Sequence, residues 1–254
     1  MSAPENVFLL TGASGVVGSA IVPELLRTTA AEIHLLLRPK GAQPVAARLD
    51  ELKTFWRRHY PDLATDALEQ RLHAVAGEIT EPALGLGAAD RDRLTARCTN
   101  IIHCAASVRM NLPLEEARRT ARFPVASVLE LGRACGNLRK VEFVSTVGVG
   151  GHWDGPLPER WINEPREFHN TYEAAKAEAE TLIEAAVADG FPATVHRPSM
   201  VIGNSRTGAV IHFQIFYFIC DFLSGRRTFG VYPKLDTGLL DVIPNDFVGR
   251  AIAA

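Results

Sequence analysis

A glycine-rich turn close to the N-terminus limits the possible folds of this chain more than any other feature. The apolar run Val7 to Leu10 leads directly into Thr11 to Gly18 (TGASGVVG), and a segment with helical periodicity follows. A strand, a tight glycine turn and a helix N-terminus are typical of the first βαβ unit of a dinucleotide-binding fold. Backbone N–H groups and the helix dipole attract a pyrophosphate at this place.

Each glycine of the turn has its own expected task. Gly12 allows the turn, Gly15 lets backbone N–H groups approach the pyrophosphate, and Gly18 lets the helix pack closely on the strand. A purely structural turn is the alternative, and a P-loop is excluded because no Gly-Lys-Ser/Thr follows. We expect cofactor contacts from Gly12, Ser14, Gly15, Val16, Val17 and Gly18.

The rest of the chain alternates short apolar runs with longer helical patterns, which is typical of an α/β fold with a parallel sheet. The fold class predicted is therefore a Rossmann-type doubly wound parallel sheet with a small partial substrate-binding region at the C-terminus. The strands are expected at Val7 to Leu10, Ile33 to Leu37, Leu72 to Val75, Asn100 to Cys104, Lys140 to Val144 and Ala193 to His196. The helices are expected at Ser19 to Thr28, Leu114 to Ala134 and Tyr172 to Ala188.

Two segments depart from this alternation. Leucines and aromatic residues recur at helical spacing between Ala46 and Arg71, which predicts a helical insertion within about 41–71. We expect a cofactor-binding domain over 1–200 and a partial substrate-binding region over 201–254. The apolar stretch Ala209 to Leu223 is too short and too polar to span a bilayer, so we expect a buried helix or an apolar wall there.

Composition excludes several classes of protein. Among 254 residues, 27 Lys and Arg are balanced by 29 Asp and Glu, so nucleic acid is not an expected partner. The four cysteines have no metal-ligand spacing, and the N-terminal segment has no basic residue before its apolar run. We therefore expect reduced thiols, no metal site, no transmembrane segment and a cytoplasmic location.

The end of the second expected strand indicates which dinucleotide binds. A fold that binds NAD usually places a carboxylate there to bind the ribose 2′-hydroxyl, whereas this chain has Arg38 and Lys40. A guanidinium at this place suits a 2′-phosphate, so NADP(H) is the expected cofactor. A solvated surface arginine is the alternative.

Tyr172 and Lys176 form a YxxxK pattern that places both side chains on one face of a helix. A nearby ammonium and the positive charge of the cofactor are expected to lower the pKa of the phenol from its usual value near 10. Two hydroxyls, Ser145 and Thr146, follow the preceding strand, and either could bind a substrate carbonyl or only cap the loop.

In combination, TGASGVVG, IIHCAAS, STVGVGG, YEAAK and HRPSMVIG resemble the extended short-chain dehydrogenase/reductase superfamily. AGEITEPALGL, HCAASVRMNLPLEEA and LDVIPNDFVGRAI are similar to its thioester reductase branch, which includes fatty acyl-CoA reductases and the terminal reductase domains of peptide synthetases. The resemblance implies a catalytic triad of Thr146, Tyr172 and Lys176. It also implies that Glu78 and Ile79 lie by the adenine, that Ala105 and Ala106 lie along the cofactor, and that Pro198, Ser199 and Val201 surround the nicotinamide.

Three departures from the branch are visible. Glu78 stands where Asp is frequent, and Ala121 stands where an Asn usually organises the active-site helix. Relatives also continue past the segment IPNDFVGRAIAA with more substrate-binding helices. The loss of the Asn is expected to affect the catalytic efficiency and not the fold.

The function expected from the resemblance is NADPH-dependent reduction of an acyl thioester to an aldehyde, with further reduction to the alcohol as an option. The acyl group is expected on CoA or on an acyl or peptidyl carrier protein. One rival is a nucleotide-sugar epimerase or dehydratase, or a hydroxysteroid-type or keto dehydrogenase, of the same superfamily. The other is an NADP-binding regulator without turnover.

Overall fold

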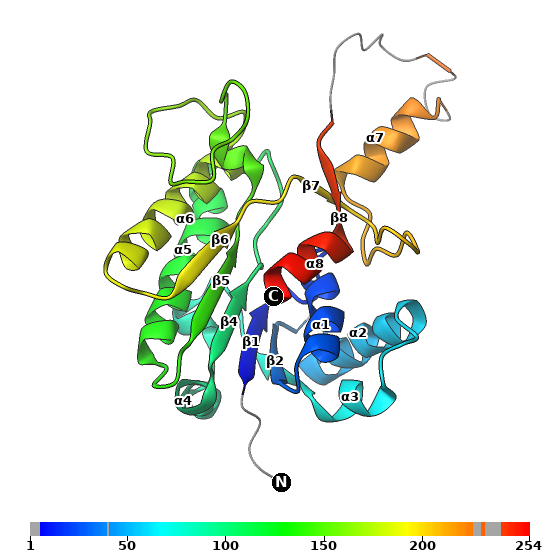
Figure 1. Ribbon diagram of the computed structural model, residues 1–254, viewed down its shortest axis with the longest axis vertical. Coiled ribbons are helices and arrows are strands. Elements are labelled where there is room, and N and C mark those ends of the chain that lie inside the picture. The colour runs from blue at the N-terminus through cyan, green and yellow to red at the C-terminus, as the bar shows by residue number, and fades with distance from the viewer. Residues whose placement is uncertain (1–5, 40, 226–229, 232–239) are drawn as a thin grey trace.

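The computed structural model describes residues 6–39, 41–225, 230–231 and 240–254, and its centre is a parallel sheet (Figure 1). Six strands take part in the order β3-β2-β1-β4-β5-β6. This order confirms the predicted doubly wound sheet, in which the strands β1 to β3 are added toward one edge and β4 to β6 toward the other. The strands are β1 (Val7–Thr11), β2 (Glu32–Leu37), β3 (Leu72–Ala76), β4 (Asn100–His103), β5 (Lys140–Val144) and β6 (Ala193–His196).

The central strands are apolar throughout because both of their faces are covered. Leu10 of β1 pairs with Leu35 of β2 on one side and with Ile102 of β4 on the other, and all three are fully buried. Continuous apolar runs of this kind are typical of parallel strands covered by helices on both faces.

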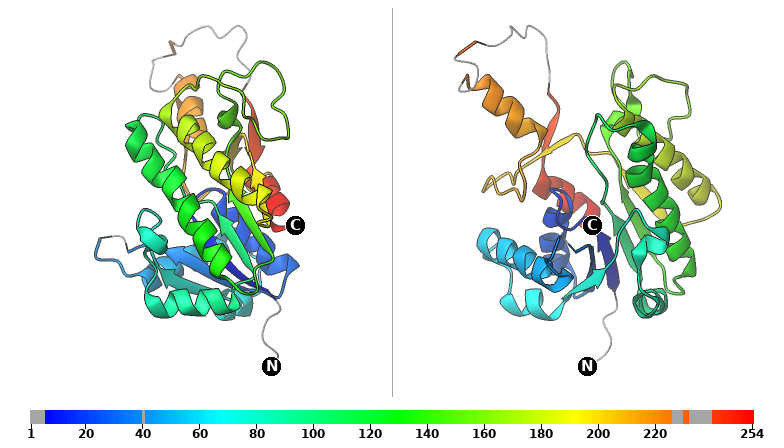
Figure 2. Two further views of the ribbon diagram at one scale, coloured as in Figure 1. Left: turned by 90° about the vertical axis from the view of Figure 1, so that its left-hand side faces the viewer. Right: turned by 180° about the vertical axis from the view of Figure 1, so that it is seen from behind.

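Two layers of helices cover the sheet (Figure 2). On one face pack α1 (Gly18–Thr28), α2 (Val45–His59), α3 (Thr65–Gln70) and α8 (Asn245–Ala253). On the other face pack η1 (Pro82–Gly85), α4 (Ala88–Arg97), α5 (Leu114–Ala134) and α6 (Thr171–Ala188). On the first face, the indole of the fully buried Trp56 donates a hydrogen bond to the carbonyl of Ser19 at 2.8 Å. This bond fastens the helical insertion to α1.

The predicted helical insertion is confirmed as the pair α2 and α3, but the sequence analysis missed α4. This helix is strongly charged, and Leu94 is its one buried residue. Because the apolar face of this helix is so narrow, its sequence shows only weak hydrophobic periodicity.

The C-terminal part adds a two-stranded parallel sheet of β7 (Met200–Ile202) and β8 (Val242–Pro244), together with α7 (Ile215–Leu223). Helix α8 returns to α1, where a Cβ at Gly249 would lie 2.7 Å from the carbonyl oxygen of Ala20. In Figure 1, α7 projects away from the sheet.

Of the two alternatives predicted for the apolar stretch, the buried helix is wrong, since no residue of α7 is buried and Phe218 is 60% exposed. Hydrophobicity alone cannot say whether another element covers a helix. Among the described residues, no helix is long and apolar enough to cross a membrane.

Candidate active site

The glycine turn joins β1 to α1 and lies against the end of β4. Gly12 has a φ of +81°, and a Cβ there would lie 2.7 Å from the backbone nitrogen of Ala105. A Cβ at Gly18 would overlap the carbonyl oxygen of Gly12. Glycine is therefore required at both positions, by backbone conformation at Gly12 and by close approach at both.

A cavity of about 410 Å³ opens beside this turn, at the carboxyl ends of β1, β2 and β4. The strand order reverses between β1 and β4, which is where ligands bind in doubly wound sheets. The cavity brings together eight of the predicted cofactor residues, namely Gly12, Ser14, Gly15, Arg38, Glu78, Ile79, Ala105 and Ala106. The lining of this cavity, with Gly12 and Gly15 of the turn at one side, fits a dinucleotide.

Arg48 also lines the cavity, and the sequence analysis missed it. Its guanidinium donates hydrogen bonds to the carbonyl oxygen of Arg38 at 2.6 Å and to the hydroxyl of Ser14 at 3.4 Å. Arg38 itself forms an ion pair with Glu78 at 3.2 Å, and its side chain is 69% exposed. Two guanidinium groups therefore stand at the mouth of the cavity, and a carboxylate already partly neutralises one of them.

The remaining predicted cofactor residues lie elsewhere. Val16 is buried, and Val17 packs against the core beneath the turn. Pro198 lines a separate cavity of about 750 Å³ next to β6 and α8, and Val201 packs on the core through β7. Ser199 precedes β7 and is partly exposed, while Lys40 lies outside the described residues.

The side chains of Asn170 and Thr171 hold the N-terminus of α6 in place. The amide oxygen of Asn170 accepts a hydrogen bond from the backbone N–H of Glu173 at 3.0 Å, as expected for an N-cap. The hydroxyl of Thr171 donates to the carbonyl of Leu112 at 2.7 Å. These bonds set the position of Tyr172 in the first turn of α6.

Tyr172 meets Thr146 directly beyond the end of β5. The two side chains are close enough for the Thr146 hydroxyl to lower the pKa of Tyr172, and the hydroxyl oxygen of Thr146 accepts the backbone N–H of Gly148 at 3.1 Å. The hydroxyl of Ser145, in contrast, is buried and has no hydrogen-bond partner among the described residues. Of the two hydroxyls left open by the sequence, Thr146 is the one placed beside Tyr172.

The protein groups around Tyr172 raise its pKa, whereas the expected lowering depended on Lys176 together with the positive charge of the cofactor. Burial raises the pKa of the phenol to about 12, the hydroxyl of Thr146 opposes this shift, and the charge of Glu173 adds to it. Tyr172 is therefore protonated across the neutral range, which is the state required of a proton donor.

Lys176 lies one turn further along α6 and is buried. Its ammonium group donates a hydrogen bond to the carbonyl oxygen of Val144 at 2.8 Å, which places the charge at the end of β5. Burial lowers the pKa of Lys176 to about 8. The group is still mostly protonated at neutral pH. All three residues of the predicted triad thus lie at the end of one strand.

Ala121 stands behind the triad, at the position where the family usually has Asn. It packs in a small apolar cluster with Ala117 of the same helix and with Ala175, which lies next to Lys176 on α6. The side chains are small, so α5 and α6 approach each other closely here. Apolar packing replaces the polar contact that the family's Asn would supply.

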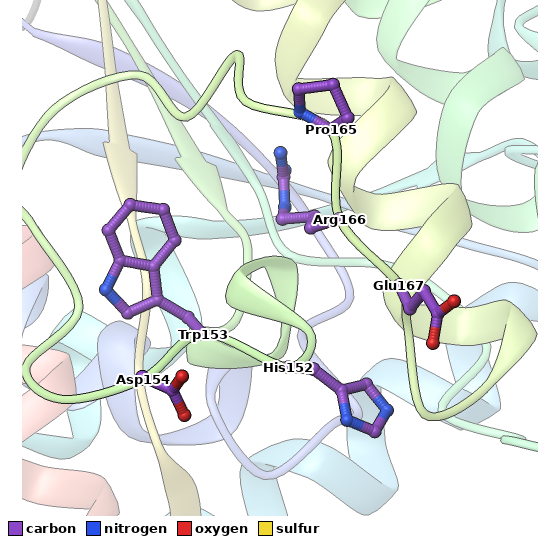
Figure 3. Close-up of a pocket in the computed structure, with 6 residues that line it drawn as sticks. All are labelled: His152, Trp153, Asp154, Pro165, Arg166 and Glu167. Atoms are coloured by element: carbon purple, nitrogen blue, oxygen red, sulfur yellow. The ribbon is translucent and has the colours of Figure 1, made fainter.

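The loop between β5 and α6 encloses an open cavity of about 570 Å³ (Figure 3). Its two stretches are joined by a hydrogen bond from the N–H of His152 to the carbonyl of Glu167 at 3.0 Å. The rings of His152 and His169 stack with their centres 4.1 Å apart, and the guanidinium of Arg160 lies 5.9 Å from the ring of Trp153. These contacts assign His152, His169 and Trp153 to packing of the loop.

Known proteins are similar to this chain in both structure and sequence. The terminal R domain from the myxalamid PKS-NRPS biosynthetic pathway is similar in structure, with a TM-score of 0.82 and 32% identity over 99% of this chain and 62% of that chain. Isonitrile lipopeptide synthase of Streptomyces coeruleorubidus is 31% identical over 82% of this chain and 14% of its own length. Fatty acyl-CoA reductase 1 of Gallus gallus is 34% identical over 54% of this chain and 27% of its own length.

The chain thus spans 62% of the R domain and much smaller parts of these two curated relatives. The family model described as Male sterility protein matches residues 10–252, from the end of β1 to the end of α8. The resemblance to the thioester reductase branch is confirmed. The chain belongs to this Male sterility family, a branch of the extended short-chain dehydrogenases/reductases with an NAD-binding fold.

Proposed function

We propose that this protein uses NADPH to reduce an acyl thioester to an aldehyde. The observation that carries the proposal is the meeting of Thr146 and Tyr172 at the end of β5, with Lys176 one helical turn away. The same edge of the sheet holds the glycine turn and its cavity. The names of the relatives, an R domain of a synthetase pathway and a fatty acyl-CoA reductase, support a thioester as the substrate.

The cavity residues fit a dinucleotide. The Cβ-free surfaces of Gly12 and Gly15 leave room for a pyrophosphate, whose charge the N-terminus of α1 attracts. Arg48 and Arg38 stand where a 2′-phosphate would be bound, which favours NADPH over NADH. When bound, NADPH supplies the hydride.

Each residue of the triad has its own role in the proposed reaction. The hydroxyls of Thr146 and Tyr172 donate hydrogen bonds to the carbonyl oxygen of the thioester and stabilise the negative charge that develops there. With the hydride on the carbonyl carbon and the Tyr172 proton on the oxygen, the thioester becomes a hemithioacetal. Its C–S bond then breaks, the hydroxyl proton passes to the leaving sulfur, and the thiol and the aldehyde are released. Tyr172 regains its proton from solvent. Lys176 holds the cofactor ribose with an ammonium that is mostly charged at neutral pH.

Several finer features belong to the same proposal. The thioester is carried by CoA or by the phosphopantetheine arm of a carrier protein, and the enzyme works in the cytoplasm. Residues 1–200 form the cofactor-binding domain, and the segment after it contributes to substrate binding. This segment reaches the cofactor cavity through His212. The apolar side chains of α7, which follow His212 along the chain, would wall an extended acyl group.

A substrate panel tests the proposal. Acyl-CoAs of increasing length and acyl-phosphopantetheine thioesters are incubated with NADPH, and the loss of absorbance is compared with the release of thiol and with aldehyde trapped by a hydrazine. We expect one thiol per aldehyde, and no turnover with ketones or nucleotide sugars. Turnover of a ketone or nucleotide sugar, with no thiol released from any thioester, would assign the protein to the rival dehydrogenase or epimerase class.

A further inference from the structure

His212 reaches the cofactor cavity from a part of the chain that is distant in sequence. It lies in the loop between β7 and α7 and lines the same cavity as Gly12 and Gly15 of the glycine turn. Among the described residues that line this cavity, the basic ones are Arg38, Arg48 and His212. The proposed function assigns the two arginines to a 2′-phosphate and leaves His212 without a defined contact.

The loop between β7 and α7 is anchored on the N-terminus of α8. The buried carboxylate of Asp246 accepts hydrogen bonds from the backbone N–H and from the hydroxyl of Ser205, both at 2.8 Å. The amide of Asn245, which is also buried, donates to the carbonyl of Ala209 at 3.3 Å. Two buried polar side chains therefore fix this loop on a helix that packs against α1.

The residues on both sides of His212 are held as well. Ile211 packs against the core between the sheet and α1. The ring of Phe213 lies next to the ring of Tyr217 in α7, with the ring centres 4.7 Å apart. The hydroxyl of Tyr217 accepts the backbone N–H of Gly203 at 2.8 Å, which closes the loop on itself. These contacts set the position of His212 at the cavity and connect it to α7.

The side chain of His212 is available to a ligand. Arg38 is paired with Glu78, and Arg48 donates to the carbonyl of Arg38 and to the hydroxyl of Ser14. His212, in contrast, forms no hydrogen bond or ion pair with any residue that the structure describes. An imidazole carries an N–H donor in its neutral form as well as in its protonated form. It can therefore donate a hydrogen bond to a phosphate oxygen.

We propose that His212 binds the pyrophosphate of the dinucleotide and that this contact couples cofactor binding to the position of α7. The pyrophosphate is the anion that the glycine turn attracts, and it has no basic side chain assigned to it so far. Because Phe213 and Tyr217 connect His212 to α7, a bound dinucleotide also holds the first turn of α7 in place. The inference rests on the part of the proposed function in which a dinucleotide fills the cavity.

Substitutions of His212 test the contact by fluorescence titration with NADPH and NADH. His212 is exposed, so its replacement leaves the core intact. His212→Leu removes the N–H donor, and we expect the affinity to fall about 5- to 10-fold, between the effect of an exposed ion pair and that of a charge-assisted hydrogen bond. The loss should be equal for NADPH and NADH, because both contain the pyrophosphate. His212→Lys supplies another donor and should bind both dinucleotides nearly as well as the wild type.

The matched control is His73→Leu. His73 is also partly exposed, and it lies on β3 beside a different cavity of about 560 Å³. Its replacement should leave the affinity for both dinucleotides unchanged.

Hydrogen exchange measures the coupling to α7. Saturation of the wild type with NADPH should slow the exchange of the backbone amides of residues 203–217, and His212→Leu should lose this protection even at saturating NADPH. Tyr217→Phe removes the hydrogen bond to Gly203 and keeps the ring. It should weaken NADPH binding by about two- to threefold in the wild type and have no further effect in the His212→Leu background, as for coupled residues.

Three results would overturn the proposal. Wild-type affinity in His212→Leu would exclude the contact, and a loss confined to NADPH would place His212 at the 2′-phosphate instead. Unchanged protection of residues 203–217 in His212→Leu would separate the contact from α7. None of these measurements needs a thioester. A wild type that binds NADPH but reduces no thioester would therefore refute the proposed function and leave this inference standing.

Discussion

Replacement of Arg48 should reveal how this protein distinguishes NADPH from NADH. The guanidinium of Arg48 is held by the carbonyl of Arg38 and the hydroxyl of Ser14, both at the rim of the cofactor cavity. It therefore faces the cavity with little side-chain freedom left to lose. A charge-assisted hydrogen bond contributes about 1.5 to 3 kcal/mol, so Arg48→Ala should weaken NADPH binding by roughly 10- to 150-fold.

Arg38→Ala should have a smaller effect on NADPH. The Arg38 side chain is 69% exposed and already paired with Glu78. An exposed ion pair between Arg38 and the phosphate would therefore contribute about 1 kcal/mol or less to the free energy of NADPH binding. We therefore expect a loss of about fivefold. Arg58→Ala is the matched control, since Arg58 lies on the same helix as Arg48, is exposed and does not line the cavity.

Fluorescence titration with NADPH and NADH measures both affinities, and competition with 2′,5′-ADP isolates the contribution of the 2′-phosphate. NADH affinity should change little in either arginine variant. Equal losses for NADPH and NADH in Arg48→Ala would refute the assignment of Arg48 to the phosphate. A larger selective loss in Arg38→Ala than in Arg48→Ala would transfer the main role to Arg38.

Three further predictions concern the triad, the turn and the buried histidine of β2. Tyr172→Phe should abolish most turnover on a proven thioester and leave NADPH affinity intact, because only the proton donor is lost; substantial remaining turnover would exclude Tyr172 as the acid. Gly18→Ala should lower the free energy of unfolding by several kcal/mol, measured in urea, because its Cβ would overlap the Gly12 carbonyl, and a stability equal to wild type would contradict that packing. Burial lowers the pKa of His34 to about 4, below the value of 6.5 in the unfolded chain. The neutral buried His34 therefore contributes fully to the free energy of unfolding above pH 6.5, and this stability is lost as the pH falls toward 4. His34→Leu should flatten the decrease in stability between pH 6.5 and 4 by up to about 3 kcal/mol, and an unchanged slope would show that other groups cause it.

The order of elements could be predicted from the sequence because the signals are local. All six strands of the main sheet were predicted to within one residue at each end, since covered parallel strands are continuous apolar runs bounded by turns or charges. The glycine turn was recognisable because only glycine fits the backbone at positions 12 and 18, where a Cβ would clash with neighbouring backbone atoms. The polar helix α4 lacked such a signal.

The sequence by itself determined the fold class, the glycine turn and the placing of Tyr172 and Lys176 on one helix face, because each depends on residues a few positions apart within one strand, turn or helix. The assignment of Thr146 to a triad came from the family resemblance and stays a prediction. Only the tertiary structure brought Arg48 of the insertion to Arg38 and Ser14 and left α7 uncovered. Contacts of this kind join elements far apart in the sequence, and no periodic pattern encodes them. The direction of the Tyr172 pKa shift was decided in the same way, because burial by distant elements outweighs the pattern of charges along one helix.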